Sequence, residues 1–198
     1  QPTQCISYVS CHDDMMLTDR LKSNKKLRPG ELQKLSKLAQ TAVLTSQGMP
    51  FLWCGEEIAR DKKGVHNSYC SPDDINAIDW SLKAKNIDLF RYYQGLIALR
   101  KAHPAFHMGD AELVRQHVHF LPTKEGVVAW ELNGEAVGDT WKRIVVILNG
   151  QERSTQVTLP EGVFHFACVD GKCPYYGERI AQESVLVSPQ SAAILYMN

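Results

Sequence analysis

Hydrophobic residues recur at helical spacing in two stretches of the first half of the chain. The first stretch covers residues 30–47 and is stopped by Gly48. The second covers residues 86–103, with Asn86 as its cap and Pro104 at its end. We therefore predict two amphipathic helices, each with one apolar face for packing.

A short run of strand-forming residues precedes each predicted helix, at Ile6–Ser10 and at Pro50–Cys54. The order strand, helix, strand, helix is typical of a βα fold with parallel strands. The polar segment 55–85 is longer than most connections, and loops of this length are usually functional or disordered. Two parallel strands cannot bury two amphipathic helices. We therefore expect residues 1–105 to be the end of a larger βα fold, or to pair with another copy of the chain.

The pattern changes after residue 105, where short apolar runs alternate with turn sequences such as Asn133-Gly134 and Asn149-Gly150. The predicted strands cover residues 112–119, 127–132, 144–149, 155–159, 163–168, 185–187 and 192–197. Short strands at near-regular spacing are typical of a β-sandwich. The fold class predicted for the whole chain is α/β over residues 1–105, followed by an antiparallel β-sandwich over 106–198.

Composition narrows the function only slightly. The 198 residues carry 22 Lys+Arg and 22 Asp+Glu, so the formal net charge is zero, which argues against a nucleic-acid partner. No apolar stretch approaches the roughly 20 residues that span a bilayer, so no membrane partner is expected. No signal-peptide pattern is visible. The chain starts at Gln1, and we expect it to be part of a longer protein whose compartment stays open.

The six cysteines are widely spaced, without a C-x-x-C motif or a Cys/His run at zinc-ligand spacing, so no metal site is expected. One pair is closer. Asp170-Gly171 is typical of a two-residue hairpin turn, which places Cys168 opposite Cys173 at a Cα separation of about 4.5 Å. That distance is at the short end of the disulfide range. Two packed free thiols are the favoured interpretation, and a disulfide is the alternative.

Candidate catalytic residues follow the two predicted strands. His12 and Asp13 come after the first strand, and Glu56-Glu57 after the second. Polar groups at the carboxyl ends of parallel strands line the active-site face of a βα fold. The pattern fits acid/base or carbohydrate chemistry, although such residues often only cap turns or form surface pairs. The loop 65–80 combines amides, carboxylates and aromatic rings, as a sugar-binding surface does, but it could equally be an ordinary polar loop.

Several motifs resemble a known family. The segments YVSCHD (8–13), AVLTSQGMPF (42–51) and GEE (55–57) resemble the last third of the catalytic barrel of α-amylase-family glycoside hydrolases. The segments NSYCSPD (67–73), IN (75–76), IDW (78–80) and GLIALRKAHPAF (95–106) are similar to type I pullulanases in particular. The resemblance covers residues 1–106 closely and continues more loosely over 107–198.

This resemblance implies that the strands at Ile6–Ser10 and Pro50–Cys54 are the seventh and eighth of a (β/α)8 barrel. Asp13 matches the carboxylate that stabilises the transition state. His12 matches a histidine that hydrogen-bonds the sugar in subsite −1, the sugar that the same carboxylate contacts. The resemblance further implies substrate-binding positions at the rim of the cleft, which are Asn67, Asp73 and Asn76. No cofactor is implied.

The family's nucleophile Asp and acid/base Glu lie on strands four and five, which precede Gln1. We therefore expect a parent enzyme that cleaves α-1,6 linkages in pullulan and branched maltooligosaccharides by a retaining mechanism, and an isolated chain that is inactive. The sequence also departs from the family at two cysteines. The family usually has asparagine at the position of Cys11, and it often has asparagine at the position of Cys70.

Other functions remain open. The sandwich could be a non-catalytic carbohydrate-binding or structural module, with candidate aromatic residues Trp130, Trp141, Tyr175 and Tyr176. A metal or thiol site using Cys11, His12, Cys54 and nearby acidic residues is disfavoured, because free cysteines usually behave as small hydrophobic residues. Finally, the incomplete βα region predicts exposed apolar faces, and hence a homodimer or an exchange of elements between copies.

Overall fold

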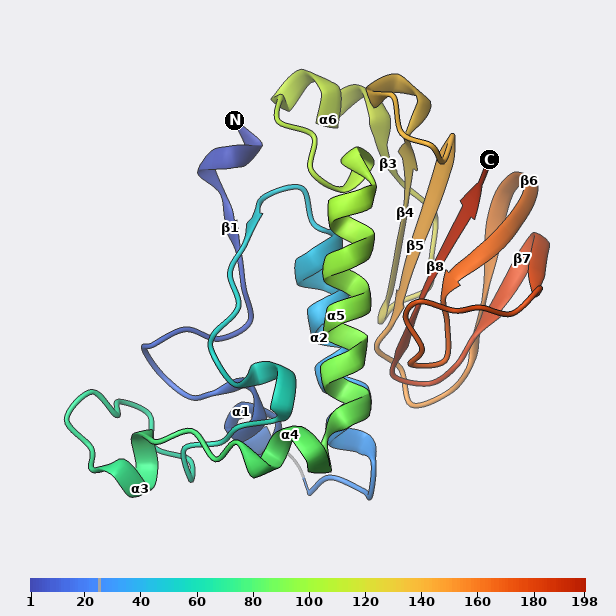
Figure 1. The fold of residues 1–198 in the computed structure, drawn as a ribbon. Coiled ribbons are helices and arrows are strands. Elements are labelled where there is room, and N and C mark those ends of the chain that lie inside the picture. The colour runs from blue at the N-terminus through green and yellow to red at the C-terminus, as the bar shows by residue number, and fades with distance from the viewer. Residues whose placement is uncertain (25) are drawn as a thin grey trace.

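The computed structural model describes residues 1–24 and 26–198. Two long helices, α2 (Glu31–Thr45) and α5 (Ile87–Ala102), lie side by side at the centre of the molecule (Figure 1). A short parallel strand pair lies on one side of these helices, and a six-stranded antiparallel sheet lies on the other. Both helices match the predicted ranges to within two residues.

The parallel pair consists of β1 (Ile6–Ser7) and β2 (Met49–Pro50). The amide N–H of Met49 donates to the carbonyl of Cys5 at 2.8 Å, and that of Phe51 donates to the carbonyl of Ser7 at 2.9 Å. The parallel pairing is as predicted, but each strand has two residues where five were expected. Pro50 lacks an N–H, so it contributes no donor to the ladder.

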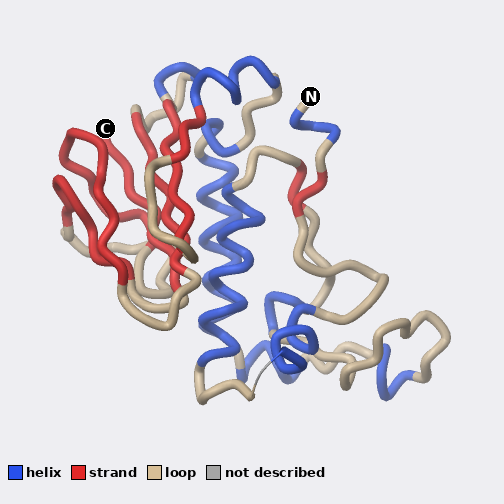
Figure 2. Tube along the Cα trace, turned by 180° about the vertical axis from the view of Figure 1, so that it is seen from behind, coloured by secondary structure: helices blue, strands red, loops and turns tan. Residues whose placement is uncertain are grey.

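Short helices and single turns lie in the connections before and between the long helices and the strands. They are η1 (Pro2–Gln4), α1 (Leu17–Asn24), η2 (Glu56–Ile58), α3 (Asp73–Asn76), α4 (Ser81–Lys85), η3 (Pro104–Phe106) and η4 (Glu135–Val137). The segment between η2 and α4 is mainly loop and projects away from the central helices (Figure 2).

The second half of the chain forms one sheet with strand order β3-β4-β5-β8-β6-β7 and antiparallel pairing throughout. Its strands are β3 (Val118–Phe120), β4 (Val127–Asn133), β5 (Arg143–Asn149), β6 (Thr155–Cys168), β7 (Ile180–Val187) and β8 (Ser191–Met197). The two predicted strands 155–159 and 163–168 are joined in β6. A register shift between Thr158 and Val163 separates its two halves, and Gly162 lies there with a φ of 140°.

The prediction of a strand over residues 112–119 was wrong. Residues Ala111–His117 form helix α6, and only Val118–Phe120 are extended. The Asp110 carboxylate accepts hydrogen bonds from the backbone N–H groups of Glu112 and Leu113 at 2.8 and 3.2 Å. This N-cap satisfies the first free donors of the helix and outweighs the strand-like alternation of its side chains.

Both faces of the central strands are buried. On β5, Ile144 and Val146 face the core shared with α2 and α5, whereas Val145 and Ile147 face a second core. The second core is closed by residues of β6 and β7, such as Phe164 and Val185, so these two strands fold over the sheet face opposite the helices. Alternate side chains of one strand thus hold the helical layer and the curled edge of the sheet.

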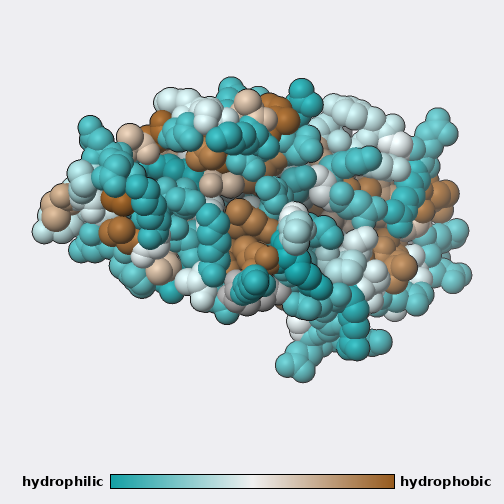
Figure 3. Space-filling view, turned by 90° about the horizontal axis from the view of Figure 1, so that it is seen from below, coloured by the Kyte–Doolittle hydropathy of each residue, from teal (hydrophilic) through white to brown (hydrophobic). Residues whose placement is uncertain are grey.

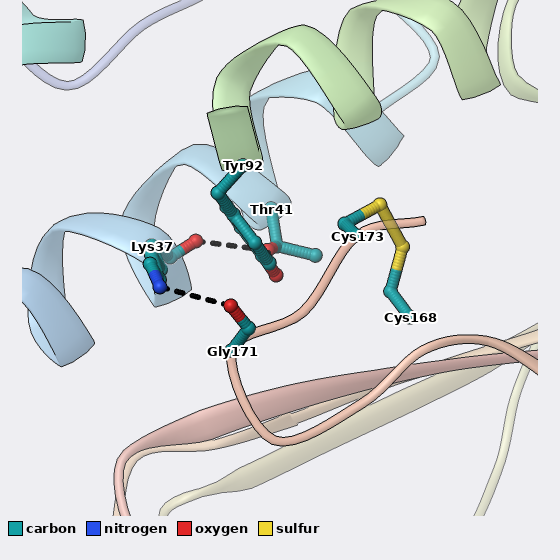
Figure 4. Close-up of a disulfide and its surroundings, with 6 residues drawn as sticks. All are labelled: Lys37, Thr41, Tyr92, Cys168, Gly171 and Cys173. Atoms are coloured by element: carbon teal, nitrogen blue, oxygen red, sulfur yellow. Dashed lines mark hydrogen bonds between the residues drawn. A yellow bond between two sulfur atoms is a disulfide. The ribbon is translucent and has the colours of Figure 1, made fainter. Parts of the chain in front are cut away.

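A hairpin at residues 169–172 connects the sheet to the helical layer (Figure 4). Asp170 and Gly171 have φ values of 50° and 71°, as a tight two-residue hairpin turn requires. Cys168 and Cys173 flank this turn and form a disulfide with a Cα separation of 4.5 Å. The favoured prediction of two free thiols is therefore wrong, and the register that placed these residues opposite each other is confirmed.

Two contacts place the hairpin against the helices. The ammonium of Lys37 on α2 donates to the carbonyl of Gly171 at 2.9 Å. On α5, a Cβ built on Gly95 would lie 2.0 Å from the carbonyl oxygen of Cys173. Gly95 is therefore required by the close approach of the hairpin backbone to the helix.

Surface hydrophobicity is dispersed on the face seen from below, where apolar side chains form small separate patches among polar ones (Figure 3). Among the described residues, no helix is both long and apolar enough to span a membrane.

The close contact at Gly95 leads to a prediction about the stability of the folded chain. Alanine normally stabilises a helix interior relative to glycine by about 1 kcal/mol. At Gly95 the added methyl group collides with the hairpin backbone, so Gly95→Ala should instead lower the free energy of unfolding by about 1–3 kcal/mol. The measurement is chemical denaturation followed by circular dichroism.

Gly109→Ala is the matched control, because a Cβ at Gly109 meets nothing within 4 Å. If Gly95→Ala proves as stable as wild type while Gly109→Ala is unchanged, the hairpin does not press against α5 as described.

Candidate functional site

The loops that follow β1 and β2 lie together at the carboxyl end of the strand pair. The hydroxyl of Ser10, in the loop after β1, donates a hydrogen bond to the carboxyl group of Glu56, at the end of the loop after β2. The Nε2 of Gln40 on α2 donates to the other Glu56 oxygen at 2.7 Å. The structure thus joins the two strand ends that the sequence predicted to share one edge, and it does so through buried side chains.

His12 and Asp13 lie at this edge and are open to solvent. Their side chains are 72% and 77% exposed, and His12 Nε2 lies 3.5 Å from Asp13 Oδ2. The Sγ of Cys11 contacts the backbone carbonyl of Asp13 at 3.7 Å. The structure therefore brings the two predicted site residues together, with both polar heads available to a ligand.

Asp14 fixes the turn that follows. Its φ is 62°, and its carboxylate accepts from the Met15 backbone N–H at 2.9 Å. The same carboxylate pairs with His66 Nδ1 at 2.7 Å and with the Arg20 guanidinium. The Met15 N–H, together with the charges of Arg20 and His66, lowers the pKa of Asp14 below its usual value. The turn is therefore tied both to α1 and to the loop that carries Asn67.

Four rings form an aromatic row beside the strand pair, made up of Tyr8, Phe51, Trp53 and His12. The ring centroids are 6.3 Å apart for Tyr8 and Phe51, and 6.3 Å for Phe51 and Trp53. The centroids of Trp53 and His12 are 6.2 Å apart. Tyr8 is 55% exposed, so the row presents aromatic surface that ends at the candidate site.

Buried charges hold the long loop in place. The carboxylate of Asp19 on α1 accepts from the backbone N–H groups of Lys62 at 2.7 Å and Gly64 at 2.9 Å. The ammonium of Lys62 donates to the Ser68 hydroxyl at 2.6 Å and lies 5.6 Å from the centre of the Trp53 ring. Burial, together with the nearby Arg60 charge, lowers the pKa of Lys62.

The three predicted rim residues occupy different environments. Asn67 and Asp73 are exposed. Asn76 is partly buried, and its Nδ2 donates to the carbonyls of Ser68 and Ser71 at 2.6 and 2.8 Å. The amide nitrogen of Asn76 thus stabilises the loop itself.

Sequence reasoning missed Asp19, Arg60 and Lys62, all buried charged residues. Arg60 donates to the carbonyls of Cys54 and Asn76 and so bridges the β2 loop to α3. Charged residues are usually solvated, and no local spacing marks these three as buried. Only the long-range contacts reveal them.

The aromatic residues considered for a sugar-binding sandwich are mostly packed inside. Trp130 is 8% exposed. The Trp141 ring stacks between His103 and Tyr196, with centroids 3.5 and 4.0 Å away. Tyr175 packs against the second core, whereas Tyr176 is 90% exposed. These four residues do not form a continuous exposed aromatic surface.

Glu56 gives the site a pH dependence. Burial raises the pKa of the Glu56 carboxyl group to about 7, although the hydrogen bonds from Ser10 and Gln40 act to lower it. An unfolded chain releases this proton near pH 4.5, whereas the folded chain keeps it until about pH 7. The unfolded state therefore binds fewer protons in this window, and the free energy of unfolding falls as the pH rises through it.

Glu56→Gln should remove this contribution, because the amide is uncharged and has nearly the same shape. We expect the free energy of unfolding of the variant to exceed that of wild type by less than about 1 kcal/mol at pH 5 and by roughly 3 kcal/mol at pH 8. Urea denaturation at several pH values measures this difference.

The exposed carboxylate of Glu161 on β6 provides the control, and Glu161→Gln should follow the wild-type pH dependence. Parallel curves for wild type and Glu56→Gln between pH 5 and 8 would contradict the burial of a protonated carboxyl group at Glu56.

Comparison with known proteins agrees with this architecture. The family model "Pullulanase, all-beta domain" matches residues 114–172. The pullulanase of Bacillus subtilis (strain 168) is 33% identical over 199 residues, which cover 100% of this chain and 28% of that protein.

Two solved structures are similar throughout. Pullulanase from Bacillus acidopullulyticus is 38% identical with a TM-score of 0.93, covering 97% of this chain and 24% of that one. Pullulanase from Anoxybacillus sp. LM18-11, complexed with maltotriose, is 35% identical with a TM-score of 0.91, covering 100% of this chain and 27% of that one.

The chain spans about a quarter of the length of these relatives. Its sequence and fold match the C-terminal portion of type I pullulanases, within the α-amylase family, and include the all-beta domain.

Proposed function

We propose that this chain is the part of an α-1,6-glucan debranching glycosidase that supplies Asp13 and His12 to the sugar next to the cleaved bond. The whole enzyme hydrolyses pullulan and branched maltooligosaccharides with retention of configuration. The observation that supports the proposal is the parallel pair β1–β2. The loops that follow these strands are joined by the Ser10–Glu56 hydrogen bond, and the exposed His12 and Asp13 come shortly after Ser10 in the chain.

The proposal extends to the architecture. β1 and β2 serve as strands seven and eight of a (β/α)8 barrel, within a unit of residues 1–105. Residues 106–198 form a C-terminal β-sandwich, in which β6 and β7 are the layer facing β4, β5 and β8. The shared core between these strands supports that assignment.

The chemistry of glycoside hydrolysis suits an exposed carboxylate at this edge. The transition state is oxocarbenium-like, so a fixed negative charge near the sugar ring is stabilising. Asp13 supplies that charge, and His12 donates or accepts a hydrogen bond with the sugar hydroxyls. The maltotriose complex of the Anoxybacillus relative supports an α-glucan as the ligand.

The loop 67–76 forms the rim of the proposed cleft. Asn67 and Asp73 are exposed there and contact the glucan. For Asn76 we propose an indirect contribution, because its Nδ2 is engaged with the Ser68 and Ser71 carbonyls.

The isolated chain is proposed to be inactive. Retaining hydrolysis needs a nucleophile and an acid/base about 5–5.5 Å apart. By family resemblance these two carboxyl groups belong to barrel strands four and five, outside the 198 residues. Asp13 alone cannot perform both steps.

The strand pair also exposes apolar surface that a complete barrel would cover. Ile6 and Tyr8 are 59% and 55% exposed, and Met49 is 48% exposed. In isolation this surface favours a homodimer or an exchange of elements between copies.

The test combines the isolated chain with a chimera. The isolated chain should release no reducing sugar from pullulan. Grafted in place of the corresponding segment of the Bacillus acidopullulyticus pullulanase, it should support pullulan hydrolysis. Asp13→Asn in the chimera should then lower kcat by about 10²–10³-fold, because one preorganised charge is lost from the transition state.

Glu161→Gln is the control, since Glu161 is an exposed carboxylate on β6, outside the loops of the proposed cleft. A chimera in which Asp13→Asn keeps kcat within a few-fold of the parent chimera would refute the proposed role of Asp13. Turnover by the isolated chain that disappears in Asp13→Asn would refute its inactivity.

A further inference from the structure

Three consecutive side chains in the loop that follows β1 carry metal-binding atoms and converge. One ligand atom each from Cys11, His12 and Asp13 lies within 4.8 Å of the other two. His12 Nε2 and Asp13 Oδ2 are 3.5 Å apart. Ligand atoms around a tetrahedral zinc ion, at their usual bond lengths, are separated by about 3.3–3.8 Å. The His–Asp distance already fits, and the exposed side chains can close the remaining gap by small rotations.

The backbone on both sides of these residues is fixed. Ser10 is buried and bonded to Glu56 just before Cys11. Just after Asp13, Asp14 is held by the Met15 N–H, Arg20 and His66. The three ligands thus lie on a segment that is anchored at each end, which lowers the entropy lost when a metal ion binds.

The types of ligand select the metal. A thiolate, an imidazole and a carboxylate form a borderline-soft set that suits zinc, whereas calcium and magnesium require oxygen ligands. Three protein ligands leave a fourth position for water, as in open zinc sites. The exposure of His12 and Asp13 keeps that position accessible.

We propose that Cys11, His12 and Asp13 form a binding site for a zinc ion. On binding, the Cys11 thiol gives its proton to the solvent and its sulfur replaces one water of the hydrated ion. The Asp13 carboxylate and the His12 imidazole then coordinate the ion as well, so the ion competes with any other ligand of these two side chains. Spacing along the sequence did not favour a zinc site, because three adjacent residues do not match the spacing of known zinc-ligand motifs.

Cobalt(II) is the probe, because it accepts the same ligands as zinc and gives a near-ultraviolet charge-transfer band when a thiolate binds it. The purified chain, kept reduced with a phosphine, should show this band at one equivalent of Co²⁺, and Zn²⁺ should abolish it. Cys11→Ala should lose the band. His12→Ala should raise the Co²⁺ concentration at half-saturation by about tenfold or more.

Cys54→Ala is the matched control, because Cys54 is a free and exposed thiol in the neighbouring loop. This variant should keep the band. The absence of a band in wild type at millimolar Co²⁺, its survival in Cys11→Ala, or its loss in Cys54→Ala would each overturn the proposal.

A second measurement needs no variant. Iodoacetamide alkylation of each cysteine, followed by peptide mass spectrometry, should be slowed by Zn²⁺ at Cys11 and unchanged at Cys54 and Cys70. Equal protection of all three, or protection of none, would overturn the site even if Cys11→Ala failed to fold.

One consequence rests on the proposed function. In the active chimera, Zn²⁺ should inhibit pullulan hydrolysis in competition with substrate, and Cys11→Asn should relieve much of that inhibition relative to its own zinc-free rate. A cobalt band that depends on Cys11, without competitive inhibition, would leave the metal site standing and remove Asp13 and His12 from the substrate site. Competitive inhibition without such a band would remove the Cys11 metal site and leave Asp13 and His12 in the substrate site.

Discussion

The buried carboxyl group of Glu56 is the contact on which the candidate site depends. It receives the hydroxyl of Ser10 from the loop after β1 and the amide of Gln40 from α2, while its own backbone starts η2 after β2. The ladder between β1 and β2 is only two residue pairs long, so it cannot by itself fix the loops that follow it. The Glu56 contacts extend the alignment of the strands beyond the ladder. His12 and Asp13 have a defined position because Ser10 does.

This arrangement explains how an exposed pair can still be ordered. The side chains of His12 and Asp13 make few contacts of their own, but the backbone on either side is held by buried or ionic groups. The same strategy continues in the long loop, where Asp19 binds two backbone N–H groups and Lys62 binds Ser68. Buried charged groups fix the backbone, and polar side chains face the solvent from it. Such a design suits the binding of a polar ligand, since the free polar groups need no rearrangement to receive it.

The sequence predicted the elements whose patterns are long and locally complete. α2 and α5 were found because fifteen- and sixteen-residue helices repeat their apolar positions several times and end at glycine or proline. Helix α6 was missed because seven residues are too few for periodicity to decide, and its Asp110 cap outweighed the alternation. The parallel strands were predicted too long because their apolar residues continue beyond the hydrogen-bonded ladder. The pairing of Cys168 with Cys173 followed from turn geometry, whereas its oxidation state did not.

The candidate site was accessible to sequence reasoning only in part, and the reason is physical. His12 and Asp13 are adjacent in the chain and directly follow a strand, so local order places them together. The partners that fix them are distant, with sequence separations of 46 for Ser10 and Glu56 and 43 for Asp19 and Lys62. A long-range pair of buried polar groups leaves no periodic trace in a single sequence. The assignment of Asn76 illustrates the same limit. Its position in a polar loop suggested a ligand contact, and only the folded loop shows that its Nδ2 is already committed to Ser68 and Ser71. Residues that hold a site and residues that use it have the same chemistry, and the three-dimensional contacts distinguish them.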